Sequence, residues 1–254
     1  MRGGGDDRLE DPSMTVGVLG TGRMGMALAR ALAAAGETVL LCSARLGWPP
    51  PDITEPGCVA VSLGELLRHG ELVLLAVPFP VAVGFVSGPA GRFGAGRTLV
   101  DATNPGQNSW RGAVRGANPP ASLPPGISGG ELIAEAAPTW QVAKAFNTVP
   151  ADQVAACRLA GAAVTVPVAG APAAKADVSA LARRLGFEPL DAGGIEASRH
   201  LESLATLLIA VSAAHHLHGR VGIHIGQPDP PVGAQAARNP ATPTAAPAAT
   251  GRHL

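Results

Sequence analysis

Tyrosine is absent from this chain of 254 residues, and aromatic residues of all kinds make up only 3% of it. Short-chain dehydrogenases move a proton through a Tyr-x-x-x-Lys pair, so the chain cannot use their chemistry. Lysine is scarce as well, because Lys144 and Lys175 are the only two among 19 basic residues. The formal net charge is zero, which argues against a nucleic-acid partner and against attraction to an acidic membrane surface.

Cysteine is sparse too, and its three positions stand far apart, at Cys42, Cys58 and Cys157. An odd, widely spaced set is typical of a reducing compartment rather than of a disulfide framework, and no pair has metal-ligand spacing. The polar N-terminus lacks the apolar core of a signal peptide. The longest apolar helical stretch, 204–214, is too short to cross a bilayer. We therefore expect a cytoplasmic protein without a membrane partner.

Recognisable acid–base machinery is missing. No Ser/His/Asp or Cys/His set and no paired carboxylates stand out in the sequence. His215, His216, His218 and His224 lie close together, but no carboxylate or cysteine accompanies them, so we expect no metal site. Hydride transfer between two rings needs stacking and a short distance, and the cofactors carry that chemistry. The shortage of acids and bases fits such a reaction.

What the sequence does contain is a glycine turn in a suitable setting. An apolar run over 14–19 leads into Gly20–Gly25, which reads GTGRMG, and an alanine-rich stretch follows. This order predicts a buried strand, a tight turn and a helix, the context in which GxGxxG binds a dinucleotide. Gly20 would allow the turn, Gly22 the close approach of a pyrophosphate and Gly25 the packing of helix on strand. A turn without a ligand is the alternative.

The residues after the second strand, expected over 38–42, distinguish the two nicotinamide cofactors. An NAD site usually carries an acid at this point, whereas this chain has Ser43 and Arg45. Arg45 predicts a bidentate contact with a ribose 2′-phosphate, beside a hydrogen bond from the Ser43 hydroxyl. A solvated loop arginine is the alternative. The sequence thus favours NADP(H).

Short apolar runs alternate with helical patterns through the next hundred residues, as in a doubly wound α/β fold. We expect strands over 58–61, 71–77, 97–101 and 140–145, and helices over 23–35, 62–68 and 128–137, with one more ending near Ser87. Ser62 with Glu65, and Ser128 with Glu131, predict capping boxes. The prediction is a single Rossmann-type, mostly parallel sheet.

Two of these strands end in loops that contain proline. One loop holds Val77, Pro78 and Phe79, and the other holds Asn104 and Pro105. In an open α/β sheet the carboxyl ends of the strands line the ligand crevice, so both loops are predicted to face the cofactor. The alternative is that each proline only stops its strand.

The C-terminal third predicts a small extension of the same sheet. A strand over 163–169, a helix over 172–185 and a strand over 187–191 form a βαβ unit, and Pro167 predicts a position near an edge. A final strand is expected over 219–226.

The last long helix is expected over Glu196–His218. Its apolar stripe consists of Leu201, Leu204, Leu208, Val211 and His215. Core packing and a homodimer contact explain this stripe equally well.

Three domain-level expectations follow from composition. Residues 1–13 and the Pro/Ala-rich tail 227–254 are predicted to be disordered, and 14–226 to form one NADP-binding domain. The loop over 105–127 is rich in Gly, Pro and Asn, and loops of this length are either functional lids or disordered.

Several fragments together resemble the F420-dependent NADP oxidoreductase family, which includes reductase domains acting on flavin or ferric iron. The fragments are GVLGTGRMG, the arginine after the second strand, AVPFP, DATNP, VAKAFNTV and VPVAG, in that order over about residues 15–226. The glycine turn alone is generic, whereas the ordered set AVPFP, DATNP and KAFN is more specific.

The resemblance implies a Rossmann fold that binds NADP(H). It assigns Thr21, Gly22, Arg23 and Met24 to the phosphate turn, and Ser43 and Arg45 to the 2′-phosphate site. It assigns Val77, Pro78, Phe79, Asn104 and Pro105 to the nicotinamide side, and Ala145, Phe146 and Asn147 to the segment where a second ring would stack. Archaeal members carry a histidine near the position of Phe146, and this chain does not.

The sequence therefore predicts an NADPH-dependent oxidoreductase that passes hydride between nicotinamide and a deazaflavin (F420) or flavin-like acceptor. One alternative is a reductase of C=N or C=C bonds, as in imine reductases, which carry a large helical C-terminal domain that this chain lacks. A non-catalytic NADP-binding sensor is the other alternative.

Overall fold

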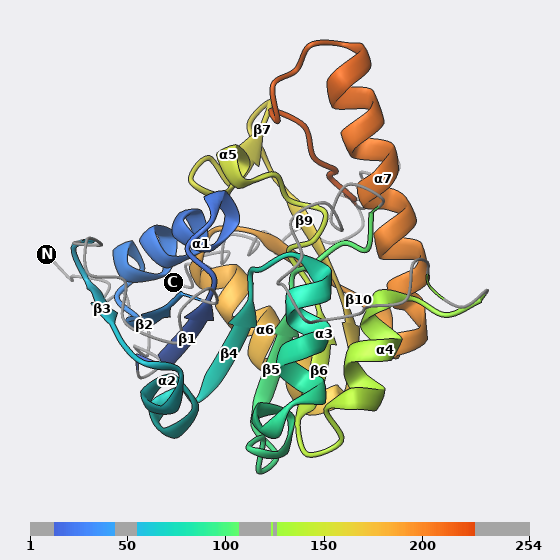
Figure 1. Ribbon diagram of the computed structural model, residues 1–254. Helices are drawn as coiled ribbons and strands as arrows, with labels where there is room; N and C mark the ends of the chain where they lie inside the picture. The colour runs from blue at the N-terminus through green and yellow to red at the C-terminus, as the bar shows by residue number, and fades with distance from the viewer. Residues whose placement is uncertain (1–12, 44–54, 107–122, 124–125, 227–254) are drawn as a thin grey trace, which may run out of the picture. The chain divides into compact units, whose positions relative to one another are not determined.

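An eight-stranded sheet forms the centre of the computed structural model, which describes residues 13–43, 55–106, 123 and 126–226. The strand order is β10-β9-β6-β5-β4-β1-β2-β3, and the strands from β6 to β3 in this order are parallel (Figure 1). The strands are β1 Thr15–Leu19, β2 Thr38–Cys42, β3 Cys58–Ala60, β4 Leu72–Leu75, β5 Thr98–Asp101, β6 Gln141–Lys144, β9 Thr165–Gly170 and β10 Glu188–Gly193. A separate small ribbon pairs β7 Arg158–Leu159 with β8 Ala162–Ala163.

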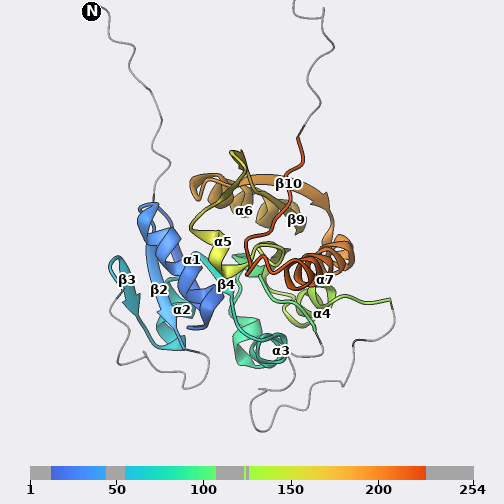
Figure 2. The same cartoon turned by 90° about the horizontal axis from the view of Figure 1, so that it is seen from above.

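Helices cover both faces of this sheet, as the sequence predicts. The helices are α1 Arg23–Ala34, α2 Leu63–His69, α3 Phe79–Ser87, α4 Gly129–Ala136, α5 Ala151–Val154, α6 Pro172–Arg184 and α7 Ser198–Ala214, with short 3-10 turns η1 Pro89–Arg92 and η3 Ile195–Ala197. Viewed from above, α1 and α6 lie on one face, and α2, α3 and α4 lie on the other (Figure 2). Both capping boxes, at Ser62 and Ser128, are formed.

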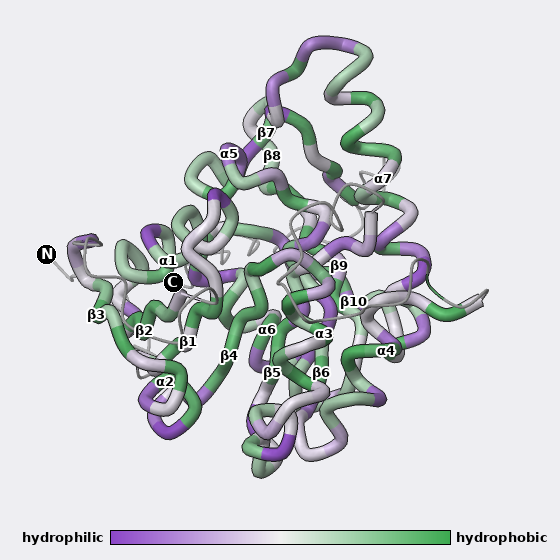
Figure 3. The backbone as a smooth tube through the Cα atoms, viewed as in Figure 1, coloured by the Kyte–Doolittle hydropathy of each residue, from purple (hydrophilic) through white to green (hydrophobic). Residues whose placement is uncertain are grey.

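Alternate side chains of the central strands feed the two hydrophobic cores. Val16 and Val18 of β1 pack in the core beneath α1 and α6, whereas Leu19 packs in the core beneath α2, α3 and α4. Burial on both faces explains why these strands are continuously apolar, which Figure 3 shows as green segments through the sheet. The doubly wound fold class is confirmed.

The chain order creates a crevice at the carboxyl edge of the sheet. The chain runs outward through β1, β2 and β3 and then returns to β4 on the other side of β1. Ligands of open α/β sheets bind where the strand order reverses in this way. The turn after β1 and the loop after β4 therefore flank the expected ligand crevice.

The C-terminal strands reverse direction relative to β6. β9 is antiparallel to β6 and pairs with it only at its last residues, Ala169 with Lys144 and Gly170 with Ala143. Residues 165–168 therefore extend past the end of β6. Pro167 lies one strand in from the edge strand β10, and its missing N–H costs no bond to β6 because that pairing starts at Ala169.

Two predictions about the C-terminal segment are corrected. The last helix ends at Ala214 rather than His218, because His216 and His218 adopt left-handed backbone with φ of 51° and 50°. The Leu217 N–H bonds back to the Ser212 carbonyl at 2.9 Å, which is the helix-ending Schellman pattern. The strand predicted over 219–226 is not formed.

Some predictions fall outside the described residues. These are the disorder of 1–12 and 227–254 and most of the 105–127 loop, where 107–122 and 124–125 are not described. Among the residues described, none of the helices has the length and apolarity that crossing a bilayer requires.

Candidate functional site

The glycine turn between β1 and α1 has the geometry that the sequence predicts. Gly20 has a φ of 126°, and a Cβ there would lie 2.3 Å from the Ala76 carbonyl oxygen. A Cβ at Gly25 would lie 1.9 Å from the Gly20 carbonyl oxygen, so α1 packs on the turn only with glycine at this position. A Cβ at Gly22 would meet nothing within 4 Å. The turn is thus tightly packed on two sides and open at Gly22.

Gly22 is also the N-cap of α1, where no side chain caps the helix. The first N–H groups of a helix lack intrahelical partners and carry the positive end of its dipole, which suits a phosphate. Arg23 extends beside this helix end and forms a surface ion pair with Asp152 of α5 at 2.6 Å. Its side chain is 79% exposed, so it remains accessible from solvent.

A cavity of about 710 Å³ runs from this turn to α7. The predicted site residues that line it are Gly22, Arg23, Met24, Val77, Pro78, Phe79, Asn104 and Asn147. They come from the ends of β1, β4, β5 and β6, which are distant in sequence. The structure therefore brings eight of the sixteen predicted site residues together around one cavity.

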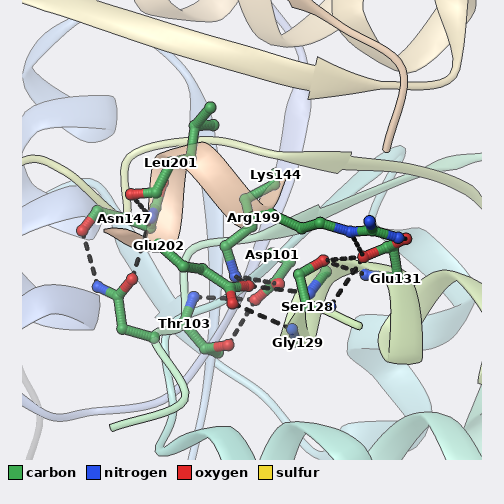
Figure 4. Close-up of polar contacts among 12 residues, drawn as sticks. Asp101, Thr103, Ser128, Gly129, Glu131, Lys144, Asn147, Arg199, Leu201 and Glu202 are labelled. Atoms are coloured by element: carbon green, nitrogen blue, oxygen red, sulfur yellow. Dashed lines mark hydrogen bonds and ion pairs between the residues drawn. The ribbon is translucent and has the colours of Figure 1, made fainter. Parts of the chain in front are cut away.

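An asparagine pair joins the loops after β5 and β6. Asn104 donates from Nδ2 to the Asn147 carbonyl oxygen at 2.8 Å, and Asn147 donates from Nδ2 to Asn104 Oδ1 at 3.0 Å. Asn147 also donates to the Leu201 carbonyl oxygen of α7 at 3.1 Å (Figure 4). These bonds fix both strand-end loops and α7 relative to one another at the cavity wall.

Two buried polar atoms at this wall lack a hydrogen-bond partner among the described residues. They are Oδ1 of Asn147 and Oγ1 of Thr148, and both residues line the cavity with 6% and 4% exposure. Buried polar atoms are nearly always paired, because an unpaired one costs free energy. A ligand that offers an N–H donor and a carbonyl acceptor would pair both atoms.

Phe146 and Ala145 do not lie at the cavity. The Phe146 side chain is completely buried, and its ring packs edge-on against Phe187 with centroids 6.1 Å apart. Its φ of 62° is a strained conformation for a bulky residue. This turn sends Phe146 into the core and leaves Asn147 at the cavity, so stacking of Phe146 on a ligand ring does not follow from the geometry.

The remaining predicted residues that the structure describes are not among those that line this cavity. Thr21 lines a second hollow between α1 and α5, and Pro105 lines a third beside α7. Ser43 is buried just after β2, next to Cys42, whose carbonyl accepts a hydrogen bond from Gly20 at 2.9 Å. Arg45 lies outside the described residues, so the 2′-phosphate contact stays a prediction.

Sequence reasoning did not predict the wall formed by α7 and the turn after it. This wall includes Leu208, Ser212, His216 and His218, and Thr148 in the loop after β6 is a further cavity residue that was not predicted. Leu208 belongs to the apolar stripe predicted on this helix, which is the signal that was available. The described residues contain no His, Cys, Asp or Glu group suited to a metal ion.

Beneath the cavity lies a buried ionic cluster that the sequence did not predict. Lys144, at the end of β6, has no exposed side-chain surface. Its Nζ lies 2.8 Å from Asp101 Oδ2 and 2.8 Å from Glu202 Oε1 (Figure 4). The presence of a lysine in an otherwise apolar strand is the feature of the sequence that could have indicated this cluster.

A second ion pair joins α4 to α7 at the surface. Arg199 donates from Nε and Nη2 to the Glu131 carboxylate at 2.8 and 2.5 Å, and Ser128 also donates to this carboxylate. The hydrogen bonds from Arg199 lower the pKa of Glu131 to about 2. Partial burial acts in the opposite direction, and the hydrogen bonds from Ser128 lower the pKa further.

This pKa predicts a specific loss of stability in acid. Because the pKa is lowered on folding, the stabilisation is complete above the unfolded value of about 4.5 and disappears as the pH falls toward 2. We expect Glu131→Gln to remove about 1 kcal/mol of this pH-dependent stability, a value discounted for solvent screening. Urea unfolding at pH 7 and pH 3 measures the difference. The exposed Glu135→Gln on the same helix is the matched control, and an equal change in both variants would contradict the assignment.

Residues 15–105 match the family described as NADP oxidoreductase, coenzyme F420-dependent. This segment is similar to that family. It contains the glycine turn and both proline-containing loops, so the predicted family resemblance is confirmed. Over this segment the chain is therefore similar to NADP-dependent oxidoreductases.

Solved structures extend the similarity beyond this segment. A protein from Arthrobacter sp. FB24, described as an F420-dependent NADP reductase, is 27% identical with a TM-score of 0.70, covering 85% of this chain and all of that one. A protein of Sinorhizobium meliloti is 29% identical with a TM-score of 0.58, covering 73% of this chain and 87% of that one. An imine reductase from Pseudomonas sp., 15% identical with a TM-score of 0.53, covers 81% of this chain and 62% of that one and shows the fold alone.

Among curated proteins, the metalloreductase STEAP3 of Rattus norvegicus is 27% identical over 197 residues. The match covers 76% of this chain and 37% of the relative, so this chain spans well under half of that protein.

Proposed function

We propose that this chain transfers hydride between NADP(H) and a flavin or deazaflavin ring. The observation that carries the proposal is the cavity itself, which joins an open glycine turn to an apolar wall on α7. Its volume of about 710 Å³ lies within the range of small-ligand sites. Such a cavity has room for a nicotinamide ring and for part of a second ring.

The residues present fit NADP(H). The open space at Gly22 would receive the pyrophosphate, and the N-terminus of α1 would stabilise its charge. The unpaired Asn147 Oδ1 and Thr148 Oγ1 would bond to the carboxamide, which offers both a donor and an acceptor. Val77 and Phe79 would pack on the ring and keep water away. When bound, NADPH supplies the hydride, and the protein sets the position of the ring.

The test is NADPH oxidation by the purified protein with F420, FMN or FAD as acceptor, followed by the near-ultraviolet absorbance of NADPH. We expect turnover with at least one of these acceptors. Absence of NADPH oxidation with all three would overturn the proposal and, if NADPH still binds, would favour a sensor.

The histidines at the cavity support a second candidate function. Reduction of a C=N bond needs a proton donor, and His216 and His218 line the cavity. With an imine substrate we would expect His216→Ala or His218→Ala to lower turnover, whereas ring-to-ring transfer depends less on either residue. Turnover with cyclic imines but not with flavins would favour this second function.

The choice of NADP(H) over NAD(H) can be tested at Arg45. If Arg45 contacts the 2′-phosphate, Arg45→Ala should weaken NADPH binding about 10- to 100-fold and leave NADH binding nearly unchanged. Calorimetric titration with both nucleotides measures this difference. Arg68→Ala on α2 is the matched control. Equal losses for NADPH and NADH would exclude this role for Arg45.

A homodimer through α7 is a further part of the proposal. Leu207 and Ile209 of this helix are large apolar side chains that are 58% and 65% exposed, and burying them against a second copy would remove this apolar surface from water. Sedimentation equilibrium tests it, with Leu207→Glu expected to shift a dimer toward monomer. A wild-type mass equal to that of one chain would contradict it.

A further inference from the structure

Lys144 is completely buried between two carboxylates that belong to different parts of the fold. Asp101, also fully buried, ends β5, whereas Glu202 lies on α7, about one hundred residues later. Two carboxylates and one ammonium group carry a formal charge of −1 in the interior. Such a cluster is costly to desolvate, and well-packed apolar side chains of similar size are often at least as stabilising. Stability alone is therefore a weak reason for this arrangement.

Asp101 connects the ammonium group to one wall of the cavity. Its Oδ1 accepts hydrogen bonds from the Thr103 backbone N–H at 2.9 Å and from the Thr103 hydroxyl at 2.7 Å. Thr103 and Asn104 line the cavity. The Asp101 carboxylate thus fixes the strand-end loop that we assign to the nicotinamide side.

Glu202 connects the same ammonium group to the wall formed by α7. It lies about one turn before Ala205 and about two turns before Leu208, which line the cavity from α7. Its carboxylate also accepts hydrogen bonds from the Gly129 and Gly130 N–H groups at the start of α4, at 3.1 and 3.0 Å. Glu202 therefore holds α7 to both α4 and β6 (Figure 4).

The local sequence is adapted to this junction. A Cβ at Gly130 would lie 2.4 Å from the Ser198 hydroxyl and 3.1 Å from Lys144 Cδ. A Cβ at Gly129 would lie 3.1 Å from Glu202 Oε1. The glycine pair that opens α4 lets α7 approach closely enough for Glu202 to reach the lysine.

We propose that Lys144 is a positioning residue of the cavity, in addition to the asparagine pair that joins the same loops to α7. Through Asp101 and Glu202 its ammonium group sets the separation between the strand-end loop and α7, and so the distance across which two bound rings would exchange hydride. The proposal rests on the proposed function for this last step. An error of about 1 Å in such a distance can lower a transfer rate about 100-fold.

The test compares Lys144→Met, which keeps the length of the side chain and removes its charge, with Glu202→Gln and with a control. The control is Lys175→Met, which removes the other lysine of the chain from its surface pair with Asp191. Binding of 2′,5′-ADP, which lacks the nicotinamide, verifies that each variant has a folded glycine turn. Amide hydrogen exchange over 102–106 and 198–208 reports on the two walls without any turnover.

We expect Lys144→Met to speed exchange in both segments, Glu202→Gln to speed it mainly in 198–208, and Lys175→Met to change neither. The single-turnover hydride-transfer constant should fall about 10- to 100-fold in Lys144→Met, with an NADPH KM close to that of the wild type. A purely structural loss would lower the amplitude of the single turnover, which counts active molecules, and leave its rate constant unchanged.

Two results would overturn the proposal. One is a Lys144→Met variant that binds 2′,5′-ADP and keeps wild-type exchange in either segment or a wild-type transfer constant. The second result is needed if Lys144→Met does not fold. In that case, wild-type amide exchange over 198–208 in the Glu202→Gln variant would overturn the proposal. If the wild type transfers no hydride to any acceptor, the proposed function fails, and the exchange data still decide whether Lys144 couples the walls.

Discussion

A Gly22→Ala variant is expected to fold like the wild type and to bind NADPH about 10- to 100-fold more weakly. The added Cβ would meet no protein atom within 4 Å, and the backbone at this position is extended, with φ −79° and ψ −177°. Alanine is a poorer N-cap than glycine, which lowers the stability, whereas it reduces the conformational entropy of the unfolded chain, which raises the stability. The two effects should cancel to within about 1 kcal/mol in the free energy of unfolding. The affinity loss reflects overpacking against a pyrophosphate, which costs about 1–3 kcal/mol.

Gly25→Ala gives the contrasting result three residues further along. Its Cβ would lie 1.9 Å from the Gly20 carbonyl oxygen, so the turn or the helix must move. We expect a loss of stability of about 3 kcal/mol or more, because the clash is with backbone rather than with a flexible side chain. Urea unfolding together with NADPH titration separates the two effects. Wild-type NADPH affinity in Gly22→Ala would exclude the turn as the pyrophosphate site.

Phe146→Ala is expected to destabilise the fold by about 3–5 kcal/mol, as is usual when a buried aromatic ring is removed from a core. The ring has no exposed surface and packs against Phe187. Because it does not line the cavity, the folded fraction of the variant should bind NADPH and the acceptor with wild-type affinity.

Phe146→Leu serves as the matched control, since it retains most of the buried volume and should cost less than the alanine variant. Thermal unfolding and ligand titration measure both quantities. A variant of wild-type stability that has lost acceptor binding would show that the ring leaves the core to contact the ligand.

The glycine turn and the parallel sheet could be predicted because their signals are local. Glycine at Gly20 and Gly25 is required by neighbouring backbone, and apolar runs such as Thr38–Cys42 form buried strands. The capping boxes at Ser62 and Ser128 likewise depend only on residues three apart. Such features need no knowledge of the tertiary fold.

The cavity wall on α7 and the role of Phe146 could not be predicted in this way. Leu208 and Asn147 are far apart in sequence, and only the packing of α7 across the end of the sheet brings them to the same cavity. The direction of the Phe146 side chain depends on a single left-handed backbone angle, which no propensity predicts for phenylalanine. The early end of α7 has the same origin, because His216 occupies a position that glycine usually takes.

The two lysines also differ in their access to reagents. Lys144 has no exposed side-chain surface, whereas Lys175 pairs with Asp191 at the surface. Lys175 lies on α6, on the face of the sheet away from α3 and α4. Of the two lysine side chains, a dye or biotin that reacts with amines would therefore reach Lys175, which is 17% exposed, and not Lys144, and Lys175 lies on an element that does not line the cavity.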